Sequence, residues 1–384
     1  MDGEAGDTLG VRFLEEGGQR SVEVAAWLAE FLAGARRSLD LAFYDVRLSE
    51  RPATLLRRVL STQVAAGVRV RLASDAGDKP GSAEEVERAG VEPAPRDTHE
   101  RVAELGVSPR VVRAVRGPRE LMHHKYVVRD GSAVWTGSLN LSDDGMERME
   151  NVIVTLASPA LAAAYGRDFL QLWGTGTVVA TGGFLAAPAP LRYAGEPAPT
   201  SVAFGPGRGR QINEEIAANV AAARRRVVVC SMLLSSSRIL RALVAQLDRG
   251  EVAVSGVYDR TQMDGVLDQW RAIPELAWKI AAFERVVREG QLVGKESVPF
   301  GGRERHNFMH AKSLVVDDLV LTGSHNLSHA AQDNAENVLA IASAPLAEEV
   351  TAYAERLADR YRAGDGGESG IRARLSGPSV GGSD

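Results

Sequence analysis

The stretch "LMHHKYVVRDGSAVWTGSLN" covers residues 121–140, and a related stretch, "FMHAKSLVVDDLVLTGSHN", covers residues 308–326. Each begins with His-x-Lys before an apolar run and ends with Gly-Ser-x-Asn. Residues two positions apart in a strand point to the same face, so the histidine and the lysine of each copy project together. Turn residues at 130–131 and at 317–318 predict that each stretch folds as two paired strands.

The rest of the chain repeats together with this motif. "ARRSLDLAFY" (35–44) corresponds to "ARRRVVVCSM" (223–232), and "GSLNLS" corresponds to "GSHNLS". In both halves helical stretches alternate with short apolar strands, as where "SVEVAAWLAEFLAGARRS" leads into "LDLAFY". This alternation is typical of an α/β layer structure, and the duplication predicts two similar halves.

The repeat also sets the expected boundaries. Residues 181–200, "TGGFLAAPAPLRYAGEPAPT", are rich in Pro, Gly and Ala and are predicted to be a linker. The stretches before the motifs, 76–118 and 260–305, differ most between the halves, and we expect loops there that select the substrate. The predicted division is 8–180 for the N-terminal lobe, 181–200 for the linker, 201–363 for the C-terminal lobe and 364–384 for a disordered tail.

Composition narrows the class of protein. The chain has 384 residues and a formal net charge of -5, which gives no overall attraction to nucleic acid or acidic membranes. Its first residues lack the features of a secretory signal, and no run approaches the ~18 apolar residues that span a bilayer. The single cysteine, Cys230, cannot form an internal disulfide. We therefore expect a cytoplasmic protein.

Lysine is used sparingly. Only five of the 45 basic residues are lysines, and two of the five occupy the third position of His-x-Lys. Because the chain otherwise uses arginine, these two lysines indicate that a compact ammonium is needed there. A lone His-x-Lys usually belongs to a core or a turn. Because both His-x-Lys and Gly-Ser-x-Asn recur in the second half, a functional site is favoured.

The repeated residue types suit an anionic substrate. An imidazole, an ammonium, a hydroxyl and an amide all donate hydrogen bonds, and phosphate fits such a set. Neither copy has carboxylates or Cys/His residues at metal-ligand spacing, so we expect no metal and no cofactor. Two imidazoles across a pseudo-twofold axis can divide phosphodiester cleavage, one attacking phosphorus and the other protonating the leaving oxygen. The predicted catalytic residues are His123, Lys125, His310 and Lys312, and the predicted phosphate-binding residues are Ser138, Asn140, Ser324 and Asn326.

Two pairs of carboxylates recur with the motif. Glu150 and Glu336 each follow the motif asparagine by ten residues, and we expect them behind a histidine ring, where a carboxylate fixes the tautomer. The alternative for each is a solvated charge at a strand edge. Asp130 and Asp317 lie at the predicted turns, where backbone capping is favoured over a chemical role.

These residues resemble the HxKxxxxDxxxxxxGSxN signature of the phospholipase D superfamily. The first copy matches every spacing, whereas the second has five residues instead of six between Asp317 and Gly323. The "ENV" that follows in both halves is similar to the family's downstream Glu-Asn pair. The resemblance covers roughly residues 10–363. It implies two α-β-α lobes with the active site between them, a phosphohistidine intermediate and no metal requirement, and it favours His123 as the nucleophile.

The resemblance implies a hydrolase acting on phosphoric diester bonds and leaves its substrate open. A phospholipase D would hydrolyse a phospholipid, or transfer its phosphatidyl group, at a membrane surface. A nuclease is the alternative, because Arg-rich stretches at 106–120, 205–210 and 301–306 could follow a nucleic-acid backbone, although an ordinary solvated surface explains them too. A binding protein that has lost catalysis is disfavoured by two complete motifs. Because both half-sites lie in one chain, we expect a monomer.

Overall fold

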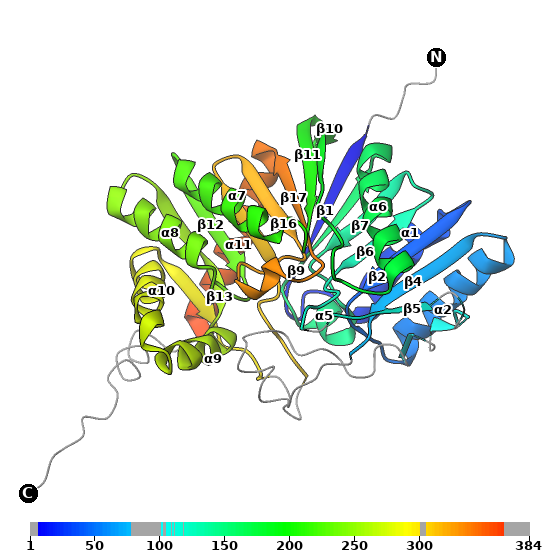
Figure 1. The fold of residues 1–384 in the computed structure, drawn as a ribbon, viewed down its shortest axis with the longest axis horizontal. Coiled ribbons are helices and arrows are strands. Elements are labelled where there is room, and N and C mark those ends of the chain that lie inside the picture. The colour runs from blue at the N-terminus through cyan, green and yellow to red at the C-terminus, as the bar shows by residue number, and fades with distance from the viewer. Residues whose placement is uncertain are drawn as a thin grey trace, which may run out of the picture.

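The computed structural model describes residues 7–77, 101–102, 105–108, 110, 112–117, 119–299 and 305–364. Within them, one 15-stranded sheet passes from an N-terminal lobe into a C-terminal lobe, with helices packed on both of its faces (Figure 1). The architecture is α/β with two similar lobes, as predicted.

The N-terminal lobe contains the large-sheet strands β1 (Thr8–Leu14), β2 (Ser38–Phe43), β4 (Arg69–Asp75), β5 (Val112–Val115), β6 (Lys125–Arg129), β7 (Ala133–Gly137) and β9 (Asn151–Ala157). Its helices are α1 (Ser21–Ala33), α2 (Glu50–Ala65), α5 (Asp143–Glu147) and α6 (Pro159–Thr175). A separate two-stranded sheet joins β3 (Val46–Arg47) to β8 (Leu141–Ser142).

The C-terminal lobe contains the strands β12 (Arg226–Ser231), β13 (Ala253–Asp259), β14 (Leu292–Lys295), β15 (Lys312–Val316), β16 (Leu319–Gly323) and β17 (Asn337–Ala342). Between the lobes lie β10 (Leu185–Tyr193) and β11 (Glu196–Phe204). The helices are α7 (Gly209–Ala222), α8 (Ser237–Arg249), α9 (Arg260–Arg271), α10 (Ala277–Glu289) and α11 (Ala344–Gly364), with short 3-10 helices η3 (Pro274–Leu276) and η4 (Ala330–Gln332).

The strand order shows the pseudo-twofold relation between the lobes. It reads β14-β13-β12-β15-β16-β17-β11-β10-β1-β9-β7-β6-β2-β4-β5. In the N-terminal lobe β2 pairs in parallel with β4 and antiparallel with β6. In the C-terminal lobe β12 pairs in the same way with β13 and β15. Each motif therefore begins on a strand at the same place in its lobe.

Apolar side chains that alternate along the strands build three cores. Helices α1 and α2 cover one face of the N-terminal sheet, and α7 and α8 cover one face of the C-terminal sheet. The other face of both lobes forms a single shared core with α6 and α11. There Tyr165 and Phe169 of α6 correspond to Tyr353 and Leu357 of α11, and all four are fully buried. These apolar helix faces join the two lobes.

The segment predicted to be the linker, 181–200, contains paired strands, because β10 and β11 form a hairpin in the middle of the sheet. Buried Ala189 and Leu191 alternate with exposed Pro188 and Pro190, so the segment has the period of a strand despite its composition. Proline has no N–H to give to a neighbouring strand, and β10 accordingly pairs with β1 at a single position. The lobes are connected by paired strands at their junction.

The predicted turns are confirmed, and they absorb the length difference between the motifs. Arg129 pairs with Ala133 across a loop of residues 130–132, whereas Val316 pairs with Leu319 across residues 317–318. The residue missing from the second motif is thus missing from a loop, and β15 and β16 stay paired as β6 and β7 do.

The predicted loops and tail are only partly described. Residues 260–299 are not a loop, because they form α9, η3, α10 and β14. Residues 78–100 of the other predicted loop, and the predicted tail beyond residue 364, lie outside the described residues. In the described part of the chain, no helix combines the length and the apolar character needed to cross a membrane.

Candidate active site

The two motif loops meet at the junction of the lobes, and each pairs with the other lobe. The backbone N–H of His123 donates to the carbonyl of Ala335 (3.0 Å), and the N–H of Ala335 donates to that of Leu121 (2.8 Å). Across the pseudo-axis, the N–H of Glu150 donates to the carbonyl of Phe308 (3.3 Å). Each motif histidine therefore faces the Glu-Asn segment of the opposite lobe.

Two buried aspartates at the carboxyl ends of β4 and β13 hold these loops. Asp75 Oδ2 accepts the backbone N–H of Met122 at 2.8 Å, and Asp259 Oδ2 accepts that of Met309 at 2.8 Å. Each methionine directly precedes a motif histidine, so the aspartates position the histidines. Sequence reasoning assigned them no role, although an aspartate at the end of both repeated strands was the available signal.

His123 is supported by a carboxylate from the other lobe. Its Nδ1 lies 2.8 Å from Glu336 Oε1, and both side chains are buried. Burial alone would raise the pKa of Glu336, but neighbouring His123 and Lys125 outweigh it and hold the pKa below its ordinary value. An ionised carboxylate only accepts hydrogen bonds, so Nδ1 of His123 carries the proton and Nε2 is the reactive nitrogen. The prediction of Glu336 behind a histidine is confirmed.

His310 is supported by an amide from the other lobe. Its Nδ1 lies 2.9 Å from Asn151 Oδ1. The amide orientation follows from its other contacts, because Asn151 Nδ2 donates to the Gly145 carbonyl (2.9 Å) and Ser138 Oγ donates to Asn151 Oδ1 (2.7 Å). His310 therefore also carries its proton on Nδ1, but no carboxylate occupies this position.

A one-residue shift in strand pairing explains the different partners. The N–H of Ser138 donates to the carbonyl of Val152 (3.0 Å), whereas the N–H of Ser324 donates to that of Asn337 (3.1 Å). In each lobe, the residue that directly precedes this hydrogen-bond acceptor contacts the motif histidine of the other lobe. It is an asparagine in the N-terminal lobe and a glutamate in the C-terminal lobe.

The prediction that Glu150 lies behind a histidine ring is therefore wrong. Its Oε2 lies 2.6 Å from Lys295 Nζ, and Tyr361 donates a hydrogen bond to its Oε1. Burial raises the pKa of Glu150, and Lys295 and Tyr361 offset part of the shift. Asn151 is the residue that sequence comparison missed, because matching the two "ENV" segments ignores the shift in pairing.

The two motif lysines lie beside their histidines, as predicted. Lys125 Nζ donates to the carbonyl of His123, and Lys312 Nζ donates to that of His310, both at 2.7 Å. Both lysine side chains are buried. Two ammonium groups thus reach the junction of the lobes from corresponding strands.

The motif glycines and serines position the strand that follows. Gly137 has φ 133° and Gly323 has φ 149°. A Cβ at Gly137 would lie 2.0 Å from the carbonyl oxygen of Val152, so only glycine fits. Ser138 donates its hydroxyl hydrogen to Asn151 Oδ1, and its contact with phosphate stays a prediction. Ser324 Oγ accepts the N–H of Asn337 (3.0 Å), and its contact with phosphate stays a prediction.

The remaining predicted residues fall into two groups. Asn140 and Asn326 are buried just beyond the motif serines, and their contact with phosphate stays a prediction. Asp130 and Asp317 lie at the far ends of β6 and β15, where each carboxylate accepts three consecutive backbone N–H groups, from 36–38 and from 224–226. They are turn residues, remote from the histidines.

His124 belongs to the core. Its Nε2 lies 3.0 Å from Asp168 Oδ2, and its Nδ1 lies 3.2 Å from Asn337 Nδ2. Tyr126 also donates to Asp168 (2.7 Å). This buried network joins the lobes behind the site, which agrees with the choice of His123 over His124. Among the described residues, no group of three His, Cys, Asp or Glu side chains is arranged to hold a metal ion.

Comparisons with known proteins agree with the two-lobed fold. A family described as "Cardiolipin synthase, PLD-like domain" matches residues 28–173 and 216–358, in both lobes. The structure of a phosphatidylserine synthase from Haemophilus influenzae Rd KW20 is similar, with 15% identity and a TM-score of 0.61, over 91% of this chain and 86% of that one.

Two single-lobe matches are weaker. Nuc from Salmonella typhimurium, a phospholipase D family member, is 18% identical over 44% of this chain and 95% of its own, with a TM-score of 0.32. NucT from Helicobacter pylori is 18% identical over 41% of this chain and 94% of its own, also with a TM-score of 0.32. No curated protein matches the chain.

Proposed function

Since the chain belongs to the family of cardiolipin synthase, PLD-like domains, we propose that it cleaves or transfers a phospholipid phosphodiester through a covalent phosphohistidine. One observation carries the proposal. His123 and His310 are buried, come from opposite lobes, and each donates its Nδ1 proton in a hydrogen bond to a partner from the other lobe. In that tautomer Nε2 of each ring is the atom that can attack phosphorus or move a proton.

His123 is the nucleophile in this proposal. Its Nε2 forms the bond to phosphorus while the bond from phosphorus to the leaving alcohol breaks. The ring gains positive charge as the new bond forms, and the Glu336 carboxylate 2.8 Å from Nδ1 stabilises that charge. His310 has no such support from Asn151, because the amide is neutral.

His310 is the acid and then the base. It begins as an imidazolium whose Nε2 proton passes to the leaving oxygen, while the proton on Nδ1 stays on the ring and remains hydrogen-bonded to Asn151 Oδ1. In the second step the neutral ring takes a proton from water or an acceptor alcohol as its oxygen attacks phosphorus and the P–N bond breaks. A neutral amide holds the imidazolium less firmly than a carboxylate would, which favours release of the proton.

Lys125 and Lys312 supply positive charge to the non-bridging phosphate oxygens. Both ammonium groups are buried, where charge interactions are stronger than in water. The asparagines Asn140 and Asn326 complete the proposed phosphate contacts.

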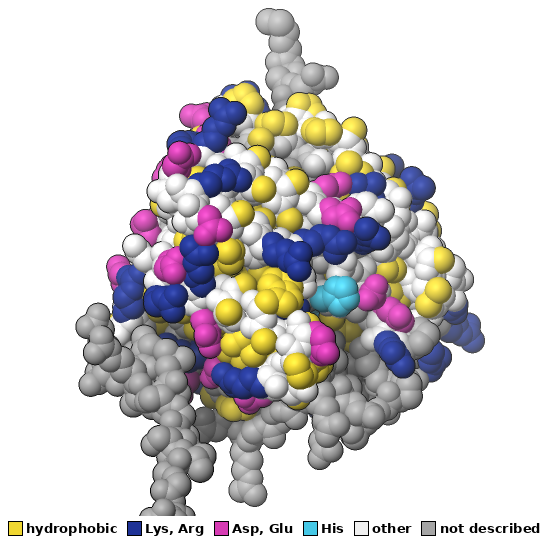
Figure 2. Space-filling view, turned by 60° about the vertical axis from the view of Figure 1, so that its left-hand side comes forward, with side chains coloured by type: hydrophobic (Ala, Val, Ile, Leu, Met, Phe, Trp, Pro, Cys, Tyr) yellow, Lys and Arg dark blue, Asp and Glu magenta, His cyan; other side chains and the backbone are white. Residues whose placement is uncertain are grey.

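The surface favours a phospholipid over nucleic acid. Figure 2 shows basic side chains interspersed with acidic ones on one face of the molecule. Three arginines of the Arg-rich stretches are paired with carboxylates: Arg208 with Glu215 (2.6 Å), Arg210 with Glu214 (2.9 Å) and Arg305 with Asp144 (2.7 Å). Paired arginines contribute less to binding a phosphate backbone than free ones do. The names of the matching family and of the phosphatidylserine synthase support the same choice.

The test offers both substrate classes to one preparation. Purified protein is incubated with EDTA and with vesicles of phosphatidylcholine or phosphatidylethanolamine, or with single- or double-stranded DNA. We expect headgroup release or exchange by the wild type, and its loss in His123→Ala and His310→Ala variants that keep the native circular dichroism spectrum. A short pulse should trap the phosphatidyl group on His123 in the wild type.

DNA cleavage with inert lipids would overturn the choice of substrate. Equal inactivity of the wild type and both variants on all substrates would overturn the catalytic proposal itself.

A further inference from the structure

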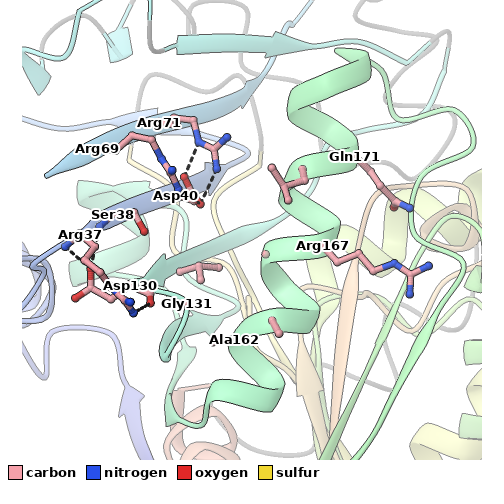
Figure 3. A pocket seen from close by; sticks show the side chains of 14 residues that line it. Arg37, Ser38, Asp40, Arg69, Arg71, Asp130, Gly131, Ala162, Arg167 and Gln171 are labelled. Carbon is pink, nitrogen blue, oxygen red and sulfur yellow. Dashed lines mark hydrogen bonds and ion pairs between the residues drawn. The ribbon is translucent and has the colours of Figure 1, made fainter.

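A groove lies at the end of the N-terminal lobe away from the candidate active site. It has a volume of about 950 Å³ and opens between α6 and the first residues of β2 and β4, beside the 130–131 turn (Figure 3). Strand β6 runs from Lys125, in the candidate active site, to Arg129, next to this turn. The groove and the histidines therefore lie at opposite ends of one strand, and the proposed chemistry does not use the groove.

An arginine held in a fixed orientation lines the groove. Arg71 Nε and Nη2 donate to the two carboxylate oxygens of Asp40 at 2.7 and 2.8 Å. Its guanidinium also lies 4.9 Å from the ring centroid of Phe169 and 5.5 Å from that of Trp173. These contacts set the plane of the guanidinium. Of its three nitrogens, Nη1 is the one that does not donate to Asp40.

Two more arginines stand on the same side of the groove, opposite α6 (Figure 3). The Arg69 side chain is 61% exposed, and its nearest carboxylate is that of Asp40, 3.8 Å away and already occupied by Arg71. Arg37 donates to the backbone carbonyl of Asp130 (2.7 Å). Because the Asp130 carboxylate is taken by backbone N–H groups, the groove presents cationic groups whose neighbouring carboxylates are already committed.

The wall formed by α6 leaves room for a ligand. Ala162, Ala163 and Gly166 line it, and a Cβ added at Gly166 would meet no atom within 4 Å. In α11 the corresponding helix position is Ala354, which is 2% exposed. The space therefore exists in one lobe and is filled in the other.

The C-terminal lobe shows that the fold does not need these charges. Strand pairing makes Val228 and Ser255 the counterparts of Asp40 and Arg71. By the same pairing, Ala253 is the counterpart of Arg69. The same sheet thus forms with small or apolar side chains there, and a half-buried ion pair adds little net stability. Charges that one copy of a fold carries and the other lacks are candidates for binding.

We propose that this groove binds the phosphate group of a small phosphate ester, at a site separate from the active site. Guanidinium groups match phosphate oxygens in shape and charge, and an arginine fixed by an aspartate and two rings loses little freedom on binding. The volume suits a small molecule. A soluble phosphate ester and the headgroup of a phosphatidic acid share this chemistry. The site stands on the groove alone, whatever reaction the histidines perform.

The experiment uses a variant built from the residues of the other lobe. The triple variant Asp40→Val, Arg69→Ala, Arg71→Ser lowers the net charge by one and leaves no unpaired carboxylate. Arg241→Ala on α8 makes the same charge change elsewhere and is the control. The probe is glycerol phosphate, and isothermal titration measures affinity and stoichiometry. We expect the wild type to bind at the groove and at the active site, with the groove affinity at least tenfold weaker in the triple variant and unchanged in Arg241→Ala.

The double variant Lys125→Ala, Lys312→Ala separates the two sites, since it should lose only the active-site binding. Glycerol phosphate binding that the triple variant retains at full stoichiometry would overturn the groove site. Binding to phosphatidic acid vesicles that needs the groove residues, without binding of glycerol phosphate, would assign the phosphate to a lipid headgroup. If the double variant binds no glycerol phosphate, the groove proposal is wrong, even if the wild type hydrolyses lipid.

Discussion

At the scale of single residues, the two histidines reach the same tautomer through different partners. Glu336 holds Nδ1 of His123 at 2.8 Å, and Asn151 holds Nδ1 of His310 at 2.9 Å. The position and the acceptor atom are alike, but only one partner is charged. A charged partner stabilises the imidazolium and a neutral one does not, so the two rings suit different steps.

A carboxylate in place of Asn151 should move the alkaline side of the activity profile. In Asn151→Asp the imidazolium form of His310 is stabilised, so the acid stays protonated to higher pH and the alkaline limb shifts upward. The rate of lipid headgroup release against pH measures the shift. Glu150→Gln, at the position that the sequence repeat equates with Glu336, is the control and should leave both limbs in place. Movement of the acidic limb in Asn151→Asp would reverse the roles of the histidines.

Removal of the Glu336 charge should slow the reaction. In Glu336→Gln the charge that develops on His123 loses its support, and we expect kcat to fall by about 10² to 10⁴. Substrate affinity should change little. A variant with unchanged kcat would remove Glu336 from the chemistry.

At the scale of elements, register controls which side chain reaches the site. The motif glycines allow β7 and β16 to approach the next strand closely, and the motif serines then fix where that strand begins to pair. One residue of shift between the lobes replaces a glutamate by an asparagine behind the opposite histidine. The shorter second turn, by contrast, changes no partner, because its loop absorbs the deletion.

Glycine at position 323 should be essential for stability. Gly323→Ala places a Cβ about 2.3 Å from the carbonyl oxygen of Asn337, at φ 149°, and should lower the free energy of unfolding by about 3 kcal/mol or more. Gly265→Ala on α9 is the control. Its Cβ meets no atom within 4 Å, so the helix should gain about 0.5–1 kcal/mol. Urea unfolding measures both, and equal midpoints would contradict the close approach.

At the scale of the whole molecule, the lobes are joined by more than the sheet. The shared core under α6 and α11 is continuous across the junction. Polar contacts reinforce it: buried Lys295 lies 2.6 Å from Glu150, and half-exposed Arg305 lies 2.7 Å from Asp144. The histidines therefore face each other across a packed interface, which keeps both half-sites in one geometry.

Removing only the lysine of the Lys295–Glu150 ion pair should lower the free energy of unfolding. Lys295→Met leaves Glu150 buried without its cation, and we expect a loss of about 3–5 kcal/mol in the free energy of unfolding. The double variant Lys295→Met, Glu150→Gln removes both charges and should recover most of the loss. A double variant as unstable as the single one would show that packing at this position, and not the charge, decides the stability. Chemical denaturation measures both.

Acid should destabilise the fold through His325. Burial lowers the pKa of His325 from 6.5 to about 4, and it outweighs the opposite effect of Glu336. Because the folded pKa is lowered, the stabilising effect is complete above pH 6.5 and is lost as the pH falls towards 4, by about 3 kcal/mol in all. In His325→Gln, which keeps a donor for Asn213, the fall in unfolding free energy over this range should be smaller. If the unfolding free energy of the wild type and of His325→Gln falls equally over this pH range, His325 is not the group responsible.

The sequence by itself determined the α/β class, the duplication, the two His-x-Lys pairs and the turn role of Asp130 and Asp317. These features follow from local periodicity, spacing and turn chemistry, which act within a few residues. Only the tertiary structure decided that each histidine is supported from the opposite lobe, that Asn151 stands where Glu150 was expected, and that the proline-rich segment completes the sheet. Strand register and contacts between the lobes depend on the packing of distant segments, and no local pattern in the chain encodes them.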